Sequence, residues 1–104
     1  MKLIRKNMAQ IAALCEKHKV VQLFAFGSIL TKRFGKDSDV DFTVIFDRDV
    51  FSIPEYANNY FELKFALEDL FGRDVDLVEY CAIKNPFFKE EIDETKQLVY
   101  GKVS

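Results

Sequence analysis

The stretch Phe26–Phe46, FGSILTKRFGKDSDVDFTVIF, holds the pattern around which the rest of the chain is organised. It starts at the end of an apolar run, passes through Gly27-Ser28 and a short basic segment, and enters a second apolar run at Asp39. Gly27 permits a turn whose backbone amides approach an anion, and the Ser28 hydroxyl can hydrogen-bond a phosphate oxygen. The stretch therefore predicts two strands joined through an anion-binding turn.

Two acidic residues, Asp39 and Asp41, open the second of these strands. Successive side chains of a strand alternate between its faces, so the two carboxylates point the same way, roughly 6–7 Å apart along the backbone. Two carboxylates on one face can reach a common site, and hard divalent cations prefer such oxygen ligands. The opposite face of this strand is hydrophobic and consists of Val40, Phe42, Val44 and Phe46.

The composition is that of one globular domain spanning residues 1–104. Apolar residues make up 49% of the 104 and charged residues 31%, a balance typical of a soluble chain with its own core. The net charge of −2 gives no overall attraction to a nucleic-acid backbone, so we do not expect a nucleic-acid partner. Because we find neither a signal peptide nor a long apolar run, we expect a cytoplasmic location.

We expect the two cysteines and the single histidine to have structural rather than catalytic roles. Cys15 and Cys81 are too few and too far apart for a disulfide framework or a metal site, so we expect both to be buried as small apolar residues. His18 is the only histidine, and it stands where a helix C-terminus favours positive charge. We expect it to be exposed at that helix end rather than to act as a general base.

The remaining patterns predict the order α-β-α-β-α-β-α, with three strands in one small mixed sheet flanked by helices. Apolar spacing predicts helices over 2–18 and from Tyr56 to Leu70, the latter starting at the capping box of Ser52 and ending at Gly72. Strands are predicted over 20–26, 39–46 and 74–80, with a turn or two of helix in 29–34. Asn85-Pro86 starts a last helix that ends at Gly101 and whose inner face is Phe88, Ile92, Thr95 and Val99.

The third predicted strand, DVDLVEY, offers one more carboxylate. Asp74 and Asp76 share a face, and either could join Asp39 and Asp41 at one end of the sheet. Two divalent ions held by such carboxylates would clamp an in-line displacement at phosphorus. The nearby cations Lys32, Arg33 and Lys36 form either a solvated cluster or a group that steers phosphate.

Gly27-Ser28, ten intervening residues and Asp39-Val40-Asp41 match the G-S-x10-D-x-D signature of the DNA polymerase β-like nucleotidyltransferase superfamily. In size and layout the chain resembles the minimal nucleotidyltransferases (MNT), a group often encoded beside an all-helical HEPN protein and acting as the antitoxin of that toxin. The resemblance covers nearly the whole chain. It implies a nucleotidyltransferase fold and a Mg²⁺-dependent enzyme, with two ions, that transfers AMP from ATP to a tyrosine of a partner HEPN toxin.

Position by position, the resemblance implies that Gly27 and Ser28 hold the triphosphate. It implies that Asp39, Asp41 and Asp76 are the catalytic, metal-binding carboxylates, with Asp76 helping to activate the acceptor hydroxyl. Asp74 remains the alternative to Asp76. Because the 104 residues leave none over for an acceptor-binding domain, we expect the acceptor to arrive on a separate molecule, or the protein to self-associate to complete the site.

One departure from the family pattern bears on activity: many members have an arginine three residues after the serine, where this chain has Thr31. Lys32 or Arg33 could take its place. An alternative function is therefore a non-catalytic antitoxin that neutralises its partner by occlusion. The eleven phenylalanines and four tyrosines favour it, because some of them, for instance Phe51, Phe87 or Tyr100, are expected to be exposed.

Overall fold

The computed structural model describes residues 1–102 and shows a four-stranded sheet in the order β3-β2-β1-β4. β1 pairs antiparallel with both β2 and β4, and β2 pairs parallel with β3. This is the predicted small mixed sheet with one strand more than the three expected. Its strands are β1 (Val20–Phe26), β2 (Val40–Phe46), β3 (Val75–Glu79) and β4 (Gln97–Tyr100).

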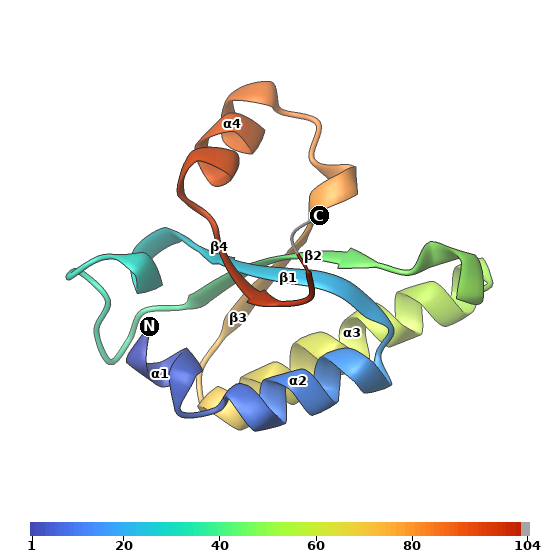
Figure 1. Ribbon diagram of the computed structural model, residues 1–104, viewed down its shortest axis with the longest axis horizontal. Helices are drawn as coiled ribbons and strands as arrows, with labels where there is room; N and C mark the ends of the chain where they lie inside the picture. The colour runs from blue at the N-terminus through green and yellow to red at the C-terminus, as the bar shows by residue number, and fades with distance from the viewer. Residues whose placement is uncertain (103–104) are drawn as a thin grey trace.

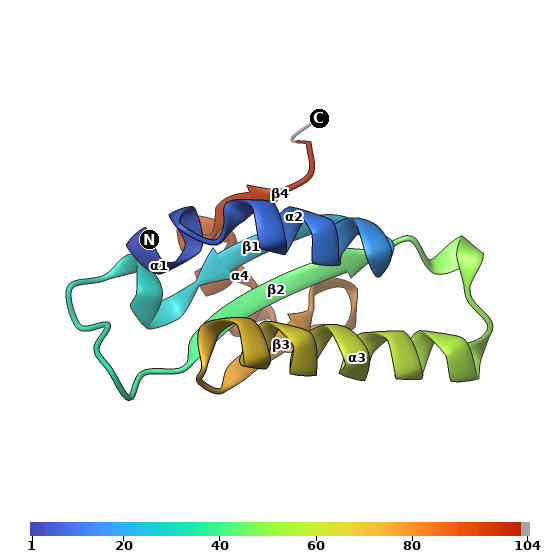
Figure 2. The same cartoon turned by 90° about the horizontal axis from the view of Figure 1, so that it is seen from below.

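Helices cover the two faces of this sheet unequally. α2 (Met8–Lys17) and α3 (Ile53–Phe71) lie side by side across one face, and α4 (Pro86–Thr95) stands on the other (Figure 1 and Figure 2). The core lies between the sheet and the α2–α3 pair. The short helical segments are α1 (Lys2–Arg5) and the 3₁₀ turns η1 (Gly27–Leu30), η2 (Arg48–Val50) and η3 (Tyr80–Ala82).

Strand alternation separates the core from the site. Val40, Phe42 and Val44 of β2 are buried in the core, as predicted, which turns Asp41 and Thr43 to the face that carries α4. Thr43 is also buried, and its hydroxyl donates a hydrogen bond of 3.0 Å to the Val78 carbonyl of β3. A side-chain hydrogen bond therefore joins β2 to β3 near Asp41, in addition to the backbone hydrogen bonds of the ladder.

Local capping signals predicted the long helix correctly. The Ser52 hydroxyl caps the helix by accepting a hydrogen bond of 3.4 Å from the Glu55 amide, as expected. The Glu55 carboxylate reaches back, as predicted, but accepts a hydrogen bond of 2.7 Å from the Ser52 hydroxyl. Gly72 ends α3 in the left-handed conformation at φ +66°. Likewise Asn85 caps α4 by accepting hydrogen bonds from the amides of Phe87 and Phe88.

The prediction for the C-terminal segment was wrong in one respect. The last helix ends at Thr95 rather than at Gly101, and Gln97–Tyr100 forms β4 on the free edge of β1. Val99 points into the core from this strand, whereas the helical prediction had placed it on the inner face of the helix. The strand forms because the edge of β1 supplies backbone partners, which helical spacing does not reveal.

The N-terminal segment also differs from its prediction. The expected helix over 2–18 is interrupted at Lys6-Asn7 and forms α1 and α2. His18 is buried rather than exposed, because its ring and its backbone carbonyl both bond Asn59 of α3: His18 Nδ1 lies 2.9 Å from Asn59 Oδ1, and Asn59 Nδ2 donates to His18 O at 2.7 Å. This pair joins the end of α2 to α3.

The cysteines behave differently from one another. Cys15 is buried in the core as expected, and burial raises the pKa of its thiol to about 12, so the thiolate form is disfavoured. Cys81, expected to be buried, is exposed on η3. Of the helices in residues 1–102, none has the length and apolar character needed to cross a membrane.

Candidate active site

The turn after β1 requires glycine at position 27. Gly27 has φ +76°, a backbone conformation that side-chain-bearing residues rarely adopt. A Cβ atom built at this position would collide with the Oδ2 atom of Asp41. Gly27 therefore makes the turn possible and also lets the Asp41 carboxylate lie directly against the backbone, so the turn and the carboxylate belong to one site.

Three side chains form a row across the sheet on the face that carries α4. In the antiparallel ladder Asp41 of β2 pairs with Phe26 of β1, and in the parallel ladder it pairs with Asp76 of β3. Paired residues point to the same face of a sheet, so the ring of Phe26 and the carboxylates of Asp41 and Asp76 lie on one surface. Asp39 precedes the first residue of β2 and lies at the same edge.

The electrostatics of Asp41 reflect two neighbouring carboxylates. Partial burial of Asp41 raises the pKa of its carboxyl to about 6, and the negative charges of Asp76 and of Asp39 add to that rise. Asp74 is not among the groups that act on Asp41; its carbonyl oxygen accepts a hydrogen bond from the Val40 amide. Of the two candidates for the third carboxylate, the structure thus brings Asp76 into the cluster.

The donor set of this cluster suits a hard divalent cation. Its ligating atoms are carboxylate oxygens, and the repulsion that adds to the effect of burial on the pKa of Asp41 is the kind that a bound cation relieves. Within residues 1–102, however, no three His, Cys, Asp or Glu side chains are arranged so that they could hold a metal ion without moving. The chemistry of the cluster fits Mg²⁺, with ligands that would still have to draw together around it.

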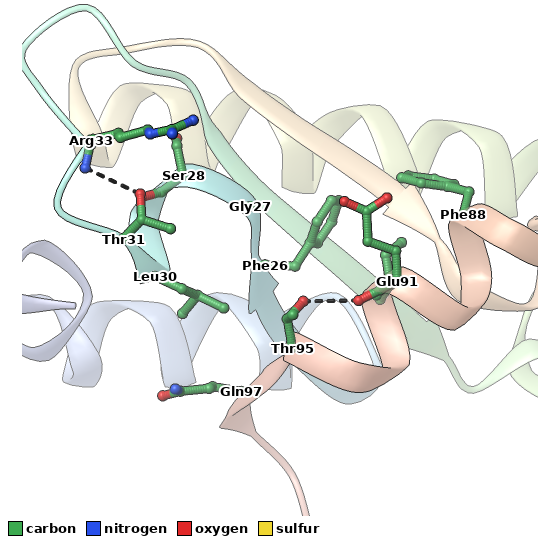
Figure 3. A pocket seen from close by; sticks show the side chains of 11 residues that line it. Phe26, Gly27, Ser28, Leu30, Thr31, Arg33, Phe88, Glu91, Thr95 and Gln97 are labelled. Atoms are coloured by element: carbon green, nitrogen blue, oxygen red, sulfur yellow. Dashed lines mark hydrogen bonds between the residues drawn. The ribbon is translucent and has the colours of Figure 1, made fainter.

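A cleft of about 630 Å³ adjoins this row, within the size range of small-molecule sites. Its walls come from the turn after β1 on one side and from α4 and β4 on the other (Figure 3). Gly27 and Ser28, the predicted phosphate-binding residues, both line it. The lining residues are Phe26, Gly27, Ser28, Leu30, Thr31, Arg33, Phe88, Glu91, Ile92, Thr95 and Gln97.

Arg33 is the cation that this cleft contains. Of the three basic residues that follow the turn, Arg33 lines the cleft, and Figure 3 shows its side chain extending over Ser28. Thr31, at the position where the family pattern led us to expect arginine, connects the two residues. Its hydroxyl donates a hydrogen bond of 2.8 Å to the Ser28 carbonyl and accepts one of 3.2 Å from the Arg33 amide.

Sequence reasoning missed the second wall of the cleft. Phe88 and Thr95 were assigned to the inner face of the last helix, and no site role was given to Glu91 or Gln97. The signal is visible in retrospect, because Phe88, Glu91 and Thr95 follow helical i, i+3, i+7 spacing and so share one face of α4. Which surface that face covers depends on the tertiary placement of α4, which the local pattern does not specify.

Comparison with known proteins agrees with this geometry. The profile of the nucleotidyltransferase domain family matches residues 8–99. Two curated proteins of Methanocaldococcus jannaschii, named "Putative protein adenylyltransferase MJ0128" and "Putative protein adenylyltransferase MJ1379", are 41% and 36% identical to the chain over 85 residues. In both cases the match spans 82% of this chain and 80% of the relative.

Solved structures share the fold. One described as a "putative minimal nucleotidyltransferase" superposes with a TM-score of 0.73 at 27% identity, covering 92% of each chain. A toxin–antitoxin structure with AMP-PNP gives a TM-score of 0.71 at 21% identity, covering 92% of this chain and 74% of that one. A complex of a tri-AMPylated HEPN toxin with an MNT antitoxin from Shewanella oneidensis gives 0.66 at 20% identity, covering 95% and 73%. The chain belongs to the nucleotidyltransferase domain family and has the fold of a minimal nucleotidyltransferase.

Proposed function

We propose that this nucleotidyltransferase transfers AMP from ATP to a hydroxyl in a Mg²⁺-dependent reaction, and that the acceptor is a tyrosine of a partner HEPN toxin, which it thereby neutralises. The observation that carries the proposal is the pairing of Asp41 with Asp76 beside a cleft lined by Gly27 and Ser28. The relatives named as protein adenylyltransferases and the antitoxin complex with a tri-AMPylated HEPN toxin support the choice of nucleotide and acceptor.

The triphosphate binds at the end of the cleft formed by the turn. Gly27 leaves the backbone unshielded, so the amides of the turn can donate to phosphate oxygens, and the Ser28 hydroxyl adds a further donor. Arg33 contributes the positive charge at this end of the cleft. A guanidinium presents several donors in a fixed plane, so Arg33 takes over the task of the arginine that other members carry at the position of Thr31.

Asp39, Asp41 and Asp76 would hold Mg²⁺, with two ions as the expected number. When bound, Mg²⁺ neutralises charge on the triphosphate and makes the acceptor hydroxyl more acidic. Asp41 is the most buried of the three, and the charges of the other two both act on it, so it would be a ligand held in place by its surroundings. Asp76 is exposed on an edge strand, where an acceptor from solvent can reach it.

Transfer proceeds by displacement at the α-phosphorus of ATP. The acceptor oxygen forms a bond to that phosphorus while the bond to the bridging oxygen breaks, and pyrophosphate leaves with the electron pair. Asp76 accepts the hydrogen bond of the acceptor hydroxyl and takes its proton as the new bond forms. Ser28 and Arg33 keep the phosphates in line, so this chain contributes positioning and charge rather than a covalent nucleophile.

The alternative function, neutralisation by occlusion alone, draws support from exposed aromatic side chains. Phe61 and Phe65 on α3 are 51% and 55% exposed and stack on each other, and Phe87 is 79% exposed, as expected from the sequence. Phe51 and Tyr100, also expected to be exposed, are half-buried. Such surfaces suit contact with a partner protein whether or not the partner is modified.

A labelling experiment separates the two functions. The chain is incubated with Mg²⁺, ATP labelled at its α-phosphate and a candidate HEPN partner protein. We expect label on a HEPN tyrosine with wild type and with Asp37→Asn, an exposed loop variant, but not with the double variant Asp39→Asn/Asp41→Asn. If wild type transfers no label and the double variant still neutralises the HEPN protein, the function is occlusion instead.

A further inference from the structure

The cleft has two chemically different ends. Of its eleven lining residues two are charged, Arg33 near the turn and Glu91 on α4, and Figure 3 shows them on opposite sides of the cleft. A carboxylate repels a polyphosphate, so the Glu91 end does not suit the phosphates of a nucleotide. It suits an uncharged group that presents hydrogen-bond donors, and a nucleobase with an exocyclic amino group is such a group.

The position of Glu91 is fixed by how α4 packs on the sheet. Ile92 is buried beneath the helix, and the ring of Phe88 meets Phe26 edge to face at 6.1 Å between centroids. Beyond the last turn of the helix, the Lys96 ammonium lies 4.9 Å from the centre of the Phe24 ring and bonds Asp93 at 2.5 Å. Because α4 is packed against the sheet, the backbone that carries Glu91 is held in place more firmly than a loop would be.

Phe88 gives this end of the cleft a flat apolar surface. Its ring is partly exposed, and its contact with Phe26 is edge to face, which leaves ring surface open to the cleft. An aromatic base stacks favourably on such a ring. The two residues lie one helical turn apart on α4, so a base stacked on Phe88 would place its edge toward the Glu91 carboxylate.

We propose that Glu91 reads the exocyclic 6-amino group of adenine and so makes this cleft selective for ATP over nucleotides with an oxygen at that position. This inference rests on the proposed function and names the residue that selects its nucleotide. A carboxylate accepts hydrogen bonds and donates none, so a 6-amino group satisfies it. A 6-oxo group would set two acceptors against each other, and a desolvated acceptor without a donor is unfavourable.

The test compares ATP with inosine triphosphate (ITP), which carries an oxygen in place of the 6-amino group. Affinities are measured by competition against a fluorescent, ribose-labelled ATP in the presence of Mg²⁺. For wild type we expect ATP to bind about tenfold more tightly than ITP, the value of one good base-edge contact. Glu91→Gln should bring the two affinities within about threefold, because the amide can donate to a 6-oxo group.

Two control variants assign the effect to the base end of the cleft. Glu90→Gln changes the neighbouring exposed glutamate, which does not line the cleft, and should keep the wild-type ratio. Arg33→Ala should weaken ATP and ITP by the same factor, because the two nucleotides share their phosphates.

The outcomes are distinguishable. Equal binding of ATP and ITP to wild type, or a ratio that Glu91→Gln leaves unchanged, would overturn this inference while leaving the proposed transfer intact. GTP binding as tightly as ATP would overturn the assignment to the 6-amino group, because GTP carries its amino group at position 2. A chain that binds no nucleotide would overturn both this inference and the proposed function.

Discussion

Asp41 and Asp76 are direct partners in the parallel ladder of β2 and β3, although the whole of α3 separates them in the sequence. Their pairing places two carboxylates side by side on the face that carries α4, and Gly27 lets the first of them lie against the turn after β1. The carboxylates of β2 and β3 and the turn after β1 therefore form one arrangement.

The first prediction concerns Gly27→Ala. The substitution forces a Cβ into a left-handed backbone position and against the Asp41 carboxylate, so it should destabilise the fold by about 1–3 kcal/mol and reduce transfer. Denaturant unfolding measures the first effect and label transfer the second. Gly35→Ala is the matched control, because nothing lies within 4 Å of its added Cβ. Equal stabilities for the two variants would refute the role given to Gly27.

The second prediction concerns the pH dependence of stability in the absence of divalent ions. The pKa of Asp41 is raised from 3.8 to about 6 in the folded protein, so the folded state disfavours its charged form. This destabilisation is absent below pH 4, develops between pH 4 and 6, and is complete above that. Because the group is partly solvated, we expect it to reach about 1–2 kcal/mol.

Asp41→Asn tests that prediction. In EDTA, its gain in unfolding free energy over wild type should be near zero at pH 4 and should grow to its full value above pH 6. Asp37→Asn, in the exposed loop before β2, should show no such pH-dependent gain. A constant difference between Asp41→Asn and wild type across this range would contradict a raised pKa of Asp41, whose main cause is burial and whose further causes are the charges of Asp76 and Asp39.

The third prediction separates the two neighbouring cations Lys32 and Arg33. Arg33→Ala removes the positive charge of the cleft and should weaken ATP binding about tenfold or more, the effect of losing one charged hydrogen bond. Lys32→Ala should change it little, because Lys32 does not line the cleft. Nucleotide titration of both variants checks this, and the reverse order of effects would remove Arg33 from the phosphate site.

The fourth prediction concerns the pair that joins α2 to α3. Asn59→Ala removes both hydrogen bonds to the buried His18 and should lower the unfolding free energy by about 1–3 kcal/mol. Asn58→Ala, at the exposed neighbouring position, should change it by less than about 0.5 kcal/mol. Thermal or denaturant unfolding distinguishes them, and a neutral Asn59→Ala would contradict a stabilising role for the pair.

Features set by local chemistry were predictable from the sequence. The Ser52 cap of α3, the Gly72 helix end and the alternation along β2 are each specified by a few neighbouring residues, and the structure contains all three. The Gly27-Ser28 turn and its paired aspartates were predictable for the same reason. Convergence of Asp76 on Asp41 was expected from the resemblance and is present in the ladder, though its catalytic role remains a prediction.

Features decided by distant partners were not predictable. The spacing of Thr95 and Val99 fits a helix as well as the end of a helix followed by a strand, and the free edge of β1 decides in favour of β4. His18 stands at a helix end, where exposure is usual, and only Asn59 from a distant helix explains its burial. The α4 wall of the cleft was missed because the placement of that helix depends on its packing against Phe24 and Phe26.

The central claim is that Asp76 is the third catalytic carboxylate. Its most direct test measures AMP transfer by two variants that each change one aspartate to asparagine, Asp76 within β3 or Asp74 just before it. Asp76→Asn and Asp74→Asn are compared with wild type, using ATP labelled at its α-phosphate, Mg²⁺ and the proposed HEPN partner. We predict that Asp76→Asn lowers the transfer rate by about 10²-fold or more, as expected for loss of a general base, while Asp74→Asn stays near wild type. Equal rates for the two variants, or full activity of Asp76→Asn, would contradict the account.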